Sequence, residues 1–439
     1  MVDHAGKRVM LQKNRDGSRT VSAKERHGKT YPVIDINSRE LLALFDGMDA
    51  VRVVVGDDKV VLLPLASEIK KRERITRLVG KLQAGEPLKI GSLAHGGGIL
   101  THAVHQGLQD AGIEADLAFA NEIREDLLLH AIEHNDAWGE KTAAINVPMQ
   151  EIAGGDEWLL GQLGKLEVLE VGQPCSGASK AGKAKRGAGL TESHPEVGHL
   201  VFSTLVIIAK TQPAAVLIEC VPEYALSASA AILRTQLLDM GYVSHERILQ
   251  GRDFGSLENR IRWCCVAVTQ GVEFDFEQLE PAVREVKTLS DILDPSIGPD
   301  HPMWRAVEYL KAKRERDAAK GSRFLMQFVE PSDPEVPTIR KSYWKGGSTD
   351  PRLRHPSDPE LSRLLTHEEV ARVKGVDALL IEGLSRTQAI ELLGQAIVYE
   401  PFRAAAQRLG EALLKAADSA VELDMGGSQV ARRRERMTG

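Results

Sequence analysis

The sequence contains little cysteine and no long apolar segment. Its four cysteines, in 439 residues, lack the spacing of metal ligands, so neither a metal site nor a disulfide framework is expected. No apolar run approaches the roughly 20 residues that a transmembrane helix needs. The first residues also lack the apolar core of a secretory signal. We therefore expect a cytoplasmic protein with no metal and no membrane partner.

A strong charge imbalance and internal repeats are also absent. The formal net charge is −6, with 43% hydrophobic and 27% charged residues, which is ordinary for a soluble globular chain. Composition therefore gives no general sign of nucleic-acid binding, and any such surface has to be local. The length allows two or three packed units.

The first 70 residues read as a small α+β extension. Within them, AVRVVVGDDKVVLLPL (50–65) predicts two strands joined by a Gly-Asp-Asp turn. Residues 71–87 continue a helical spacing of apolar residues that ends in Gly and Pro, so they predict a connector helix.

From residue 88 the pattern alternates between strands and helices. This alternation predicts an α/β fold with a mostly parallel, doubly wound sheet over residues 88–270, resumed at 346–418. Between them, residues 271–345 mix Pro-rich turns with a basic segment and predict a small irregular domain. The basic tail, 419–439, is expected to be disordered.

Four candidate sites fall at the predicted carboxyl ends of strands, where ligands bind in such sheets: Gly96–Gly98, Glu122, Cys175 and Glu219. A glycine-rich turn followed by an acidic strand end suits an adenosine-containing cofactor, because the backbone admits phosphate or sugar and the carboxylate accepts from ribose. A tight structural turn is the alternative. The G-x-G-x-x-G spacing typical of nicotinamide cofactors is absent.

Cys175 and Glu219 each follow or end an apolar strand. A thiol there can serve as a nucleophile, and a buried carboxyl can deliver a proton. The alternative is that both are structural. A thiol hydrolase would also need a histidine partner, and His194 and His199 are the nearest downstream candidates.

Arg260 and Arg262 lie two residues apart, so they share one face of an extended strand. Paired guanidinium groups beside a cleft suit phosphate or carbonyl oxygens. Ion pairs at the entrance to a strand are the alternative.

This ordered set resembles the DNA cytosine-5 methyltransferases over roughly residues 88–418. The matching elements are SLAHGGG (92–98) for the F-x-G-x-G motif, Glu122 for the acidic strand end, Pro174-Cys175 for the P-C motif, Glu219-Cys220-Val221 for E-N-V, Glu258 to Arg262 for Q-x-R-x-R, and LLGQAI (392–397) for the terminal G-N-x-V element.

The resemblance implies a fold of the S-adenosylmethionine-dependent methyltransferase type. It implies S-adenosylmethionine and double-stranded DNA as partners, in a bacterial or phage-infected host cell. The donor-binding positions would be Ala94, Gly96, Gly98, Glu122, Asn146 and Gln395.

For the reaction, the resemblance implies that cytosine rotates out of the duplex. Cys175 would attack C6 of the base, and Glu219 would hold its N3 and amino edge. Arg262 would contact the base carbonyl and Arg260 would support the loop. Residues 271–345 would form the target-recognition region, and the loop after Cys175 would contact DNA phosphates through Ser179, Lys180, Lys183, Lys185 and Arg186.

The chain departs from these motifs at several positions: Ala94 replaces Phe, Asn146 replaces Asp, Ser176 replaces Gln, Cys220 replaces Asn, Glu258 replaces Gln and Gln395 replaces Asn. Three interpretations remain open: an ordinary methyltransferase, an enzyme with a modified donor or base, and a DNA-binding relative without turnover. Restriction-modification, evasion of host defence and gene regulation would all use the same parts.

Overall fold

The computed structural model describes residues 2–3, 8–12, 22–34, 39–45, 48, 50–155, 157–179, 190–279, 288–319, 321 and 326–438. The chain divides into two compact units, Met1–Glu73 and Arg74–Gly439.

The first unit contains a four-stranded sheet with the strand order β1-β2-β6-β5 and a separate hairpin, β3-β4. Its elements are β1 Val2–Asp3, β2 Arg8–Gln12, β3 Ser22–Arg26, β4 Lys29–Val33, α1 Arg39–Leu44, β5 Val51–Val55 and β6 Lys59–Pro64. The hairpin predicted for residues 50–65 is confirmed as β5-β6, whose strands pair antiparallel. Gly56 N–H donates to the Lys59 carbonyl at the turn, at 2.8 Å.

The connector helix is α2, Ala66–Ala84, which starts and ends a few residues earlier than predicted. Its second half is anchored in the second unit by basic side chains. Arg74 is fully buried and donates to Thr269 Oγ1 at 2.9 Å, and Lys81 pairs with Glu167 at 2.8 Å. These long side chains explain why a charged helix packs against an apolar sheet.

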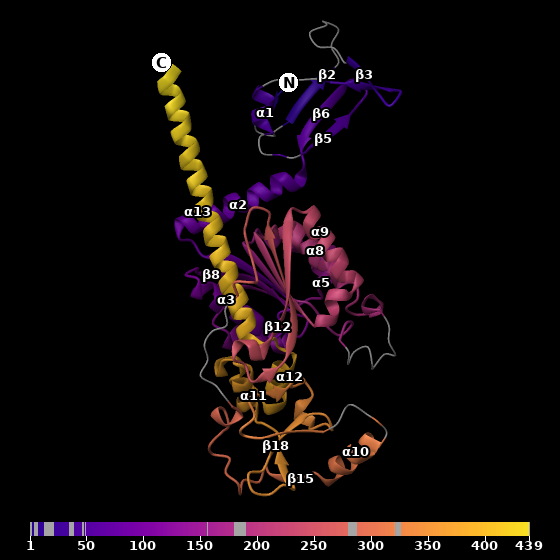
Figure 1. Ribbon diagram of the computed structural model, residues 1–439, viewed down its shortest axis with the longest axis vertical. Coiled ribbons are helices and arrows are strands. Elements are labelled where there is room, and N and C mark those ends of the chain that lie inside the picture. Colours follow the sequence, from indigo (N-terminus) through magenta and orange to yellow (C-terminus); the bar gives the residue numbers. More distant parts are fainter. Residues whose placement is uncertain are drawn as a thin grey trace. The chain divides into compact units, whose positions relative to one another are not determined.

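The second unit is built on a seven-stranded sheet with the order β12-β14-β11-β10-β7-β8-β9 (Figure 1). Its strands are β7 Leu88–Leu93, β8 Ala115–Asn121, β9 Ala143–Ile145, β10 Val168–Gly172, β11 Ala215–Cys220, β12 Tyr242–Gln250 and β14 Ile261–Thr269. The strands from β11 to β9 pair in parallel, and β14 pairs antiparallel with β11 and β12. The predicted α/β fold with a mostly parallel sheet is confirmed.

Helices cover both faces of this sheet, so the fold is doubly wound (Figure 1). On one side lie α3 (Ile99–Asp110) and α13 (Tyr399–Thr438), and on the other α5 (Met149–Gly154), α8 (Leu200–Thr211) and α9 (Ala228–Asp239). The remaining helices of this part are α4 Glu125–His134 and α6 Glu157–Gln162, with short 3-10 helices at Thr191–Ser193, Pro222–Leu226 and Gly251–Phe254.

Alternate strand residues enter the two cores, because successive side chains point to opposite faces of a sheet. In β11, Leu217 belongs to the core under α3 and α13, whereas Val216 and Ile218 belong to the core under α8 and α9. The central strand β11 is therefore almost wholly apolar, as expected for a sheet covered on both sides.

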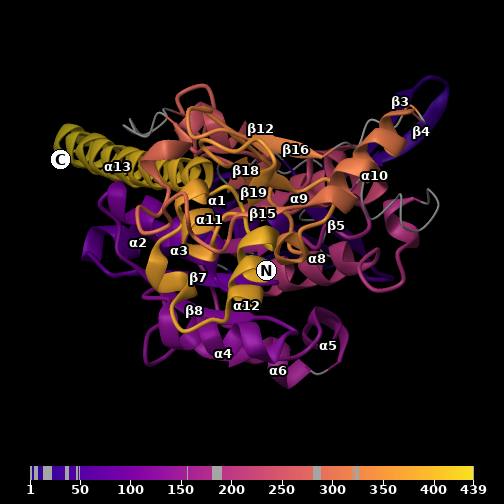
Figure 2. The ribbon, with the colours of Figure 1, turned by 90° about the horizontal axis from the view of Figure 1, so that it is seen from below.

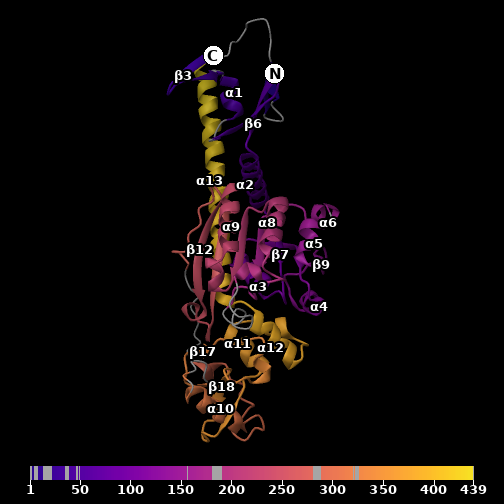
Figure 3. The same ribbon diagram turned by 90° about the vertical axis from the view of Figure 1, so that its right-hand side faces the viewer.

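The segment predicted as the recognition region contributes to a second, smaller sheet with the order β15-β19-β18-β16. Figure 3 shows β18 of this sheet near α10, apart from the main sheet. The elements of this part are β15 Arg305–Ala306, α10 Glu308–Ala319, β16 Gln327–Val329, β18 Pro351–Arg354 and β19 Leu361–Arg363, with 3-10 turns at Leu289–Asp291 and Tyr343–Lys345. The expected boundary at residue 345 falls inside this sheet, because β18 and β19 pair with strands from before it. Such pairing between short, distant strands leaves no periodic signal in the sequence.

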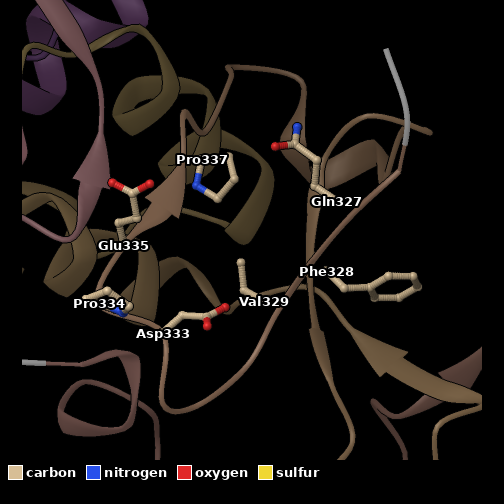
Figure 4. A pocket seen from close by; sticks show the side chains of 7 residues that line it. All are labelled: Gln327, Phe328, Val329, Asp333, Pro334, Glu335 and Pro337. Carbon is tan, nitrogen blue, oxygen red and sulfur yellow. The ribbon is translucent and has the colours of Figure 1, made fainter. Parts of the chain in front are cut away.

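A cavity of about 510 Å³ lies in the recognition region (Figure 4). Gln327 and Val329 border it from β16, and Asp333, Glu335 and Pro337 border it from the following segment. It contains none of the site residues predicted from the sequence. Its far edge, β17 (Val336–Pro337), pairs in parallel with β13 (Glu258–Asn259), which leads directly into β14.

The chain returns to the main sheet through α11 (His367–Lys374), a 3-10 turn at Ala378–Ile381, and α12 (Arg386–Gln395). Figure 2 shows α11 and α12 in front of the ends of β7 and β8. Thr366 and Glu369 form a capping box at the start of α11.

The tail expected to be disordered is helical, because α13 continues to Thr438. Residues 428–438 contain no Pro or Gly and are rich in Arg, Glu, Gln, Ala and Met, which favour helix. Within the described part of the chain, no helix combines the length and apolar character needed to cross a membrane.

Candidate active site

The nucleophile candidate and the acidic candidate lie on neighbouring strands. Gly172, the last residue of β10, is paired with Glu219 in β11. The chain then continues the ladder by one bond, in which Gln173 N–H donates to the Glu219 carbonyl at 2.9 Å. Pro174 and Cys175 follow at once, so the sheet register itself places the thiol beside β11.

Glu219 forms an ion pair with Arg262. Arg262 Nε lies 2.7 Å from Glu219 Oε1, and both side chains are only 13% exposed. The pairing follows from the antiparallel register, because Glu219 is opposite Cys264 and Arg262 lies two residues further along the same face. The structure thus brings together two residues that the sequence separates by a helix and two strands.

Cys175 is half-buried and packs against the core under α8 and α9. Its carbonyl accepts from Ala178 N–H at 3.0 Å and Ser179 N–H at 2.9 Å, which forms a tight turn. Burial and, secondarily, the charge of Glu219 raise the pKa of the thiol, while Arg262 and Arg260 act in the opposite direction. The thiol is therefore neutral at rest and is sensitive to the charge of Glu219.

Glu219 itself is electrostatically balanced between burial and two arginines. Burial raises its pKa, and the charges of Arg262 and Arg260 reduce the rise. A raised carboxyl pKa of this kind is typical of groups that take part in proton transfer.

Arg260 is placed differently from Arg262. Its guanidinium is buried and donates to the carbonyls of Ile339 at 3.3 Å and Gly394 at 3.2 Å. It contributes charge to the site but is held by main-chain groups of other segments, so its position indicates a supporting role.

Cys220, at the motif position of Asn, has a visible partner. Its Sγ donates to the Gln173 carbonyl at 3.4 Å. Both main-chain polar groups of Gln173, the residue before Pro174-Cys175, are therefore bonded to β11. Its N–H donates to the Glu219 carbonyl, and its carbonyl accepts from the Cys220 thiol.

The glycine-rich loop after β7 has an unusual backbone. Gly96 and Gly98 take φ values of 59° and 77°, and Ala94 takes 51°. Only glycine adopts this left-handed region without strain, so Ala94 is held there at a cost of about 1 kcal/mol or more. Gly98 precedes the first turn of α3.

Glu122 and Asn146 meet this loop. The Glu122 carboxylate accepts from Gly96 N–H at 2.7 Å and from Arg124 N–H at 2.9 Å. Asn146 Nδ2 donates to the Glu122 carbonyl at 2.8 Å. The structure thus brings four of the predicted donor-site residues close together: Ala94, Gly96, Glu122 and Asn146.

The side-chain hydrogen bond of Gln395 is made to its own helix and to none of these four residues. Its amide donates to Glu391 O in its own helix, at 3.2 Å. The helix nevertheless reaches the site, because Glu391 pairs with Arg124 at 2.8 Å.

A buried polar cluster beneath the loop escaped the sequence analysis. Ser92 Oγ and Thr101 Oγ1 lie 2.8 and 2.9 Å from His95 Nδ1, and the Thr101 hydroxyl donates to Glu170. Burial raises the pKa of Glu170 to about 7, although the Ser92 and Thr101 hydroxyls oppose this. A charged residue in the middle of the strand VLEVG was the signal that could have revealed it.

Ile123 was also missed. It follows Glu122 directly and leaves 65% of its side chain exposed. An exposed apolar side chain next to a carboxylate offers a surface for a flat ring, and the sequence signal was a large aliphatic residue after a strand end.

The histidines considered as partners of the thiol bond elsewhere. His194 Nδ1 accepts from Glu196 N–H at 3.1 Å, and His199 Nε2 lies 2.7 Å from Gln150 Nε2. Lys180, Lys183, Lys185 and Arg186 lie outside the described residues, whereas Ser179 belongs to the turn after Cys175. Over the described residues, no group of three or more His, Cys, Asp or Glu side chains is arranged to hold a metal ion.

The family described as C-5 cytosine-specific DNA methylase matches residues 88–411, which carry every element of this site. The chain belongs to this family. Among curated relatives, the Type II methyltransferase M.NlaX of Neisseria lactamica is 27% identical over 263 residues, 58% of this chain and 79% of the relative. The Type II methyltransferase M1.ScrFI of Lactococcus lactis subsp. cremoris is 25% identical over 258 residues, 57% of this chain and 63% of the relative.

Solved structures of methyltransferases share the fold of this family member. The S. pombe Dnmt2 methyltransferase superposes with a TM-score of 0.55 at 18% identity, covering 75% of this chain and 99% of that chain. The Entamoeba histolytica methyltransferase EhMeth gives a TM-score of 0.54 at 18% identity, covering 75% and 98%. The resemblance inferred from the motifs is therefore confirmed at the level of family and fold.

Proposed function

We propose that this DNA cytosine-5 methyltransferase transfers a methyl group from S-adenosylmethionine to C5 of a cytosine rotated out of duplex DNA, through a covalent bond from Cys175 Sγ to C6 of the base. The observation that carries the proposal is the ion pair between Glu219 of β11 and Arg262 of β14. The residue Gln173, just before Pro174-Cys175, is hydrogen-bonded to the main chain of the same Glu219.

The residues around the glycine-rich loop fit an adenosine-containing donor. No heavy atom lies within 4 Å of the position that a Cβ of Gly96 would occupy, so the loop backbone is open to a ligand. Glu122 would accept from ribose hydroxyls, Asn146 would contact the adenine amino group, and Ile123 would pack against the ring. When bound, the donor supplies an electrophilic methyl group.

The covalent sequence follows from the charges of the site. The Cys175 thiolate forms a bond to C6, while Glu219 gives a proton or hydrogen bond to N3 and Arg262 binds the base carbonyl. C5 would become nucleophilic and accept the methyl group as the bond from methyl to the donor sulfur breaks, which releases S-adenosylhomocysteine. Loss of the C5 proton to solvent, return of the N3 proton to Glu219 and cleavage of the S–C6 bond would then restore the thiolate. Covalent attack divides one difficult substitution into two easier steps.

Base binding would also activate the nucleophile. The negative charge of Glu219 contributes to the raised pKa of Cys175. While this carboxyl is protonated, as it must be to give a hydrogen bond to N3, it has no negative charge that opposes ionisation of the thiol. Attack is thereby linked to correct placement of the ring.

Contacts with DNA would come from both sides of the site. Ser179, Lys180, Lys183, Lys185 and Arg186 would bind phosphates, and the recognition region would read bases. The relatives that are Type II methyltransferases favour a role in restriction-modification.

The experiment is a trapping reaction with duplex DNA that contains 5-fluorocytosine, in the presence of S-adenosylmethionine. Fluorine at C5 blocks the elimination, so the protein should remain covalently attached to DNA, and C175A should lose the adduct and at least about a thousandfold of activity. DNA binding without an adduct would identify a non-catalytic relative instead. Mass analysis of the modified base identifies the transferred group.

A further inference from the structure

A second ion pair lies behind Arg262 and is completely buried. Glu258 of β13 pairs with Lys374, the last residue of α11, and both side chains are 0% exposed. Burial works to raise the pKa of Glu258, but Lys374 and Arg260 outweigh it, so the net effect lowers this pKa. A buried charge is tolerated only when it is paired, so each residue requires the other.

The Glu258 carboxylate makes further contacts that connect distant segments. It accepts from Ile339 N–H at 2.8 Å, and Arg260 lies 3.7 Å from it. Arg260 in turn donates to the carbonyl of the same Ile339. Both polar main-chain groups of Ile339 are therefore held by side chains from the segment that carries Arg262.

Ile339 lies within the recognition region, in the segment that joins β16 to β18. Just before it, β17 pairs with β13. Just after it, the chain crosses α12 at Gly394, where a Cβ would lie 2.2 Å from Lys341 N. Since Arg260 also donates to the Gly394 carbonyl, one buried network holds β13, residues 336–341 and α12 in a fixed arrangement.

We infer that Glu258 and Lys374 are positioning residues, which fix residues 336–341 of the recognition region against the strand that presents Arg262 to Glu219. Glu258 stands where the family motif has Gln. Its added charge is paired with Lys374, which lies 116 positions away in the sequence. This inference rests on the proposed methyl transfer, because its effect is on the placement of DNA and Arg262 around the base.

The test is a double-substitution cycle with E258Q, K374M and the combined variant. E258Q retains an acceptor for Ile339 N–H but leaves Lys374 buried without its counterion, so burial and the charge of Arg260 lower the pKa of Lys374 further. K374M leaves Arg260 as the main counterion of Glu258 and draws it from the Ile339 and Gly394 carbonyls. The combined variant removes one charge of each sign, so the network keeps the net charge of wild type, and it keeps the bond to Ile339.

We expect each single variant to lower kcat on duplex DNA by about tenfold or more, with KM for S-adenosylmethionine within about twofold of wild type. The combined variant should recover kcat to within about threefold of wild type. K415M, which removes an exposed partner of Glu273, is the matched control and should leave kcat unchanged. Thermal unfolding is followed for every variant.

The inference is overturned if single variants that melt like wild type keep wild-type kcat, or if the combined variant is no more active than the weaker single variant. If a single variant fails to fold, the combined variant still tests the inference. Its kcat must approach that of wild type, and a folded combined variant with a much lower kcat would contradict the inference. Loss of both transfer and adduct in the wild-type protein would instead contradict the proposed function, whatever the variants do.

Discussion

The two sides of the active site hold their charges in different ways. On the glycine-loop side, Glu122 accepts hydrogen bonds from main-chain N–H groups. On the nucleophile side, Glu219 is balanced by the side chain of Arg262. A main-chain donor is kept in every substitution except proline, whereas an arginine side chain is removed by any substitution. The nucleophile side should therefore be much more sensitive to mutation, and the following variants test that difference.

The largest effect is expected for R262M. Without its guanidinium, Glu219 loses an opposing positive charge, its pKa rises further, and the base carbonyl loses its donor. We expect kcat to fall by about 10²-fold, the scale measured when one transition-state donor is removed. The check is kcat as a function of pH, with R262K as the control that keeps the charge. An R262M enzyme with wild-type kcat would show that the two sides do not differ as described.

A smaller effect is expected for E122Q. The amide retains an oxygen for Gly96 N–H but loses the charge that strengthens bonds to ribose hydroxyls. We expect KM for S-adenosylmethionine to rise by about tenfold with little change in kcat. Initial rates at saturating DNA separate the two parameters, and a fall in kcat without a rise in KM would contradict the assignment.

The smallest effect on activity is expected for E170Q, which probes the cluster beneath the loop. Its pKa is raised from 4.5 to about 7, so the proton is bound more tightly in the folded state. This group therefore contributes stability below pH 4.5, and the contribution is lost as the pH rises to about 7. E170Q resembles the protonated form, so its Tm should exceed that of wild type above pH 7 and match it near pH 5. Parallel Tm–pH curves would exclude this role.

The sequence predicted those parts of the site that depend on strand ends and alternation. Cys175, Glu219 and Arg262 come together because parallel strands share one carboxyl edge and residues two apart share one face. The pairing of Glu258 with Lys374 was beyond such reasoning, since no periodicity relates two residues that meet only through tertiary packing.

The same limit explains the other differences. The small sheet of β15, β19, β18 and β16 is assembled from strands of two to four residues, which are too short to show alternation of apolar and polar residues. Glu170 was hidden because a buried acid needs hydroxyl partners from a neighbouring strand and helix, here Ser92 and Thr101. The helix at the C-terminus was missed because its composition was interpreted through charge and not through helix propensity.

The main-chain bond from Gln173 N–H to the Glu219 carbonyl limits which side-chain substitutions can disturb the spacing of the catalytic groups. The spacing between sulfur and acid is inherited from the ladder of the sheet, so it survives when the surrounding side chains are exchanged. A neighbouring position such as 176 can then be exchanged, and a paired position such as 258 can change together with its partner 374, while sulfur and acid stay in register.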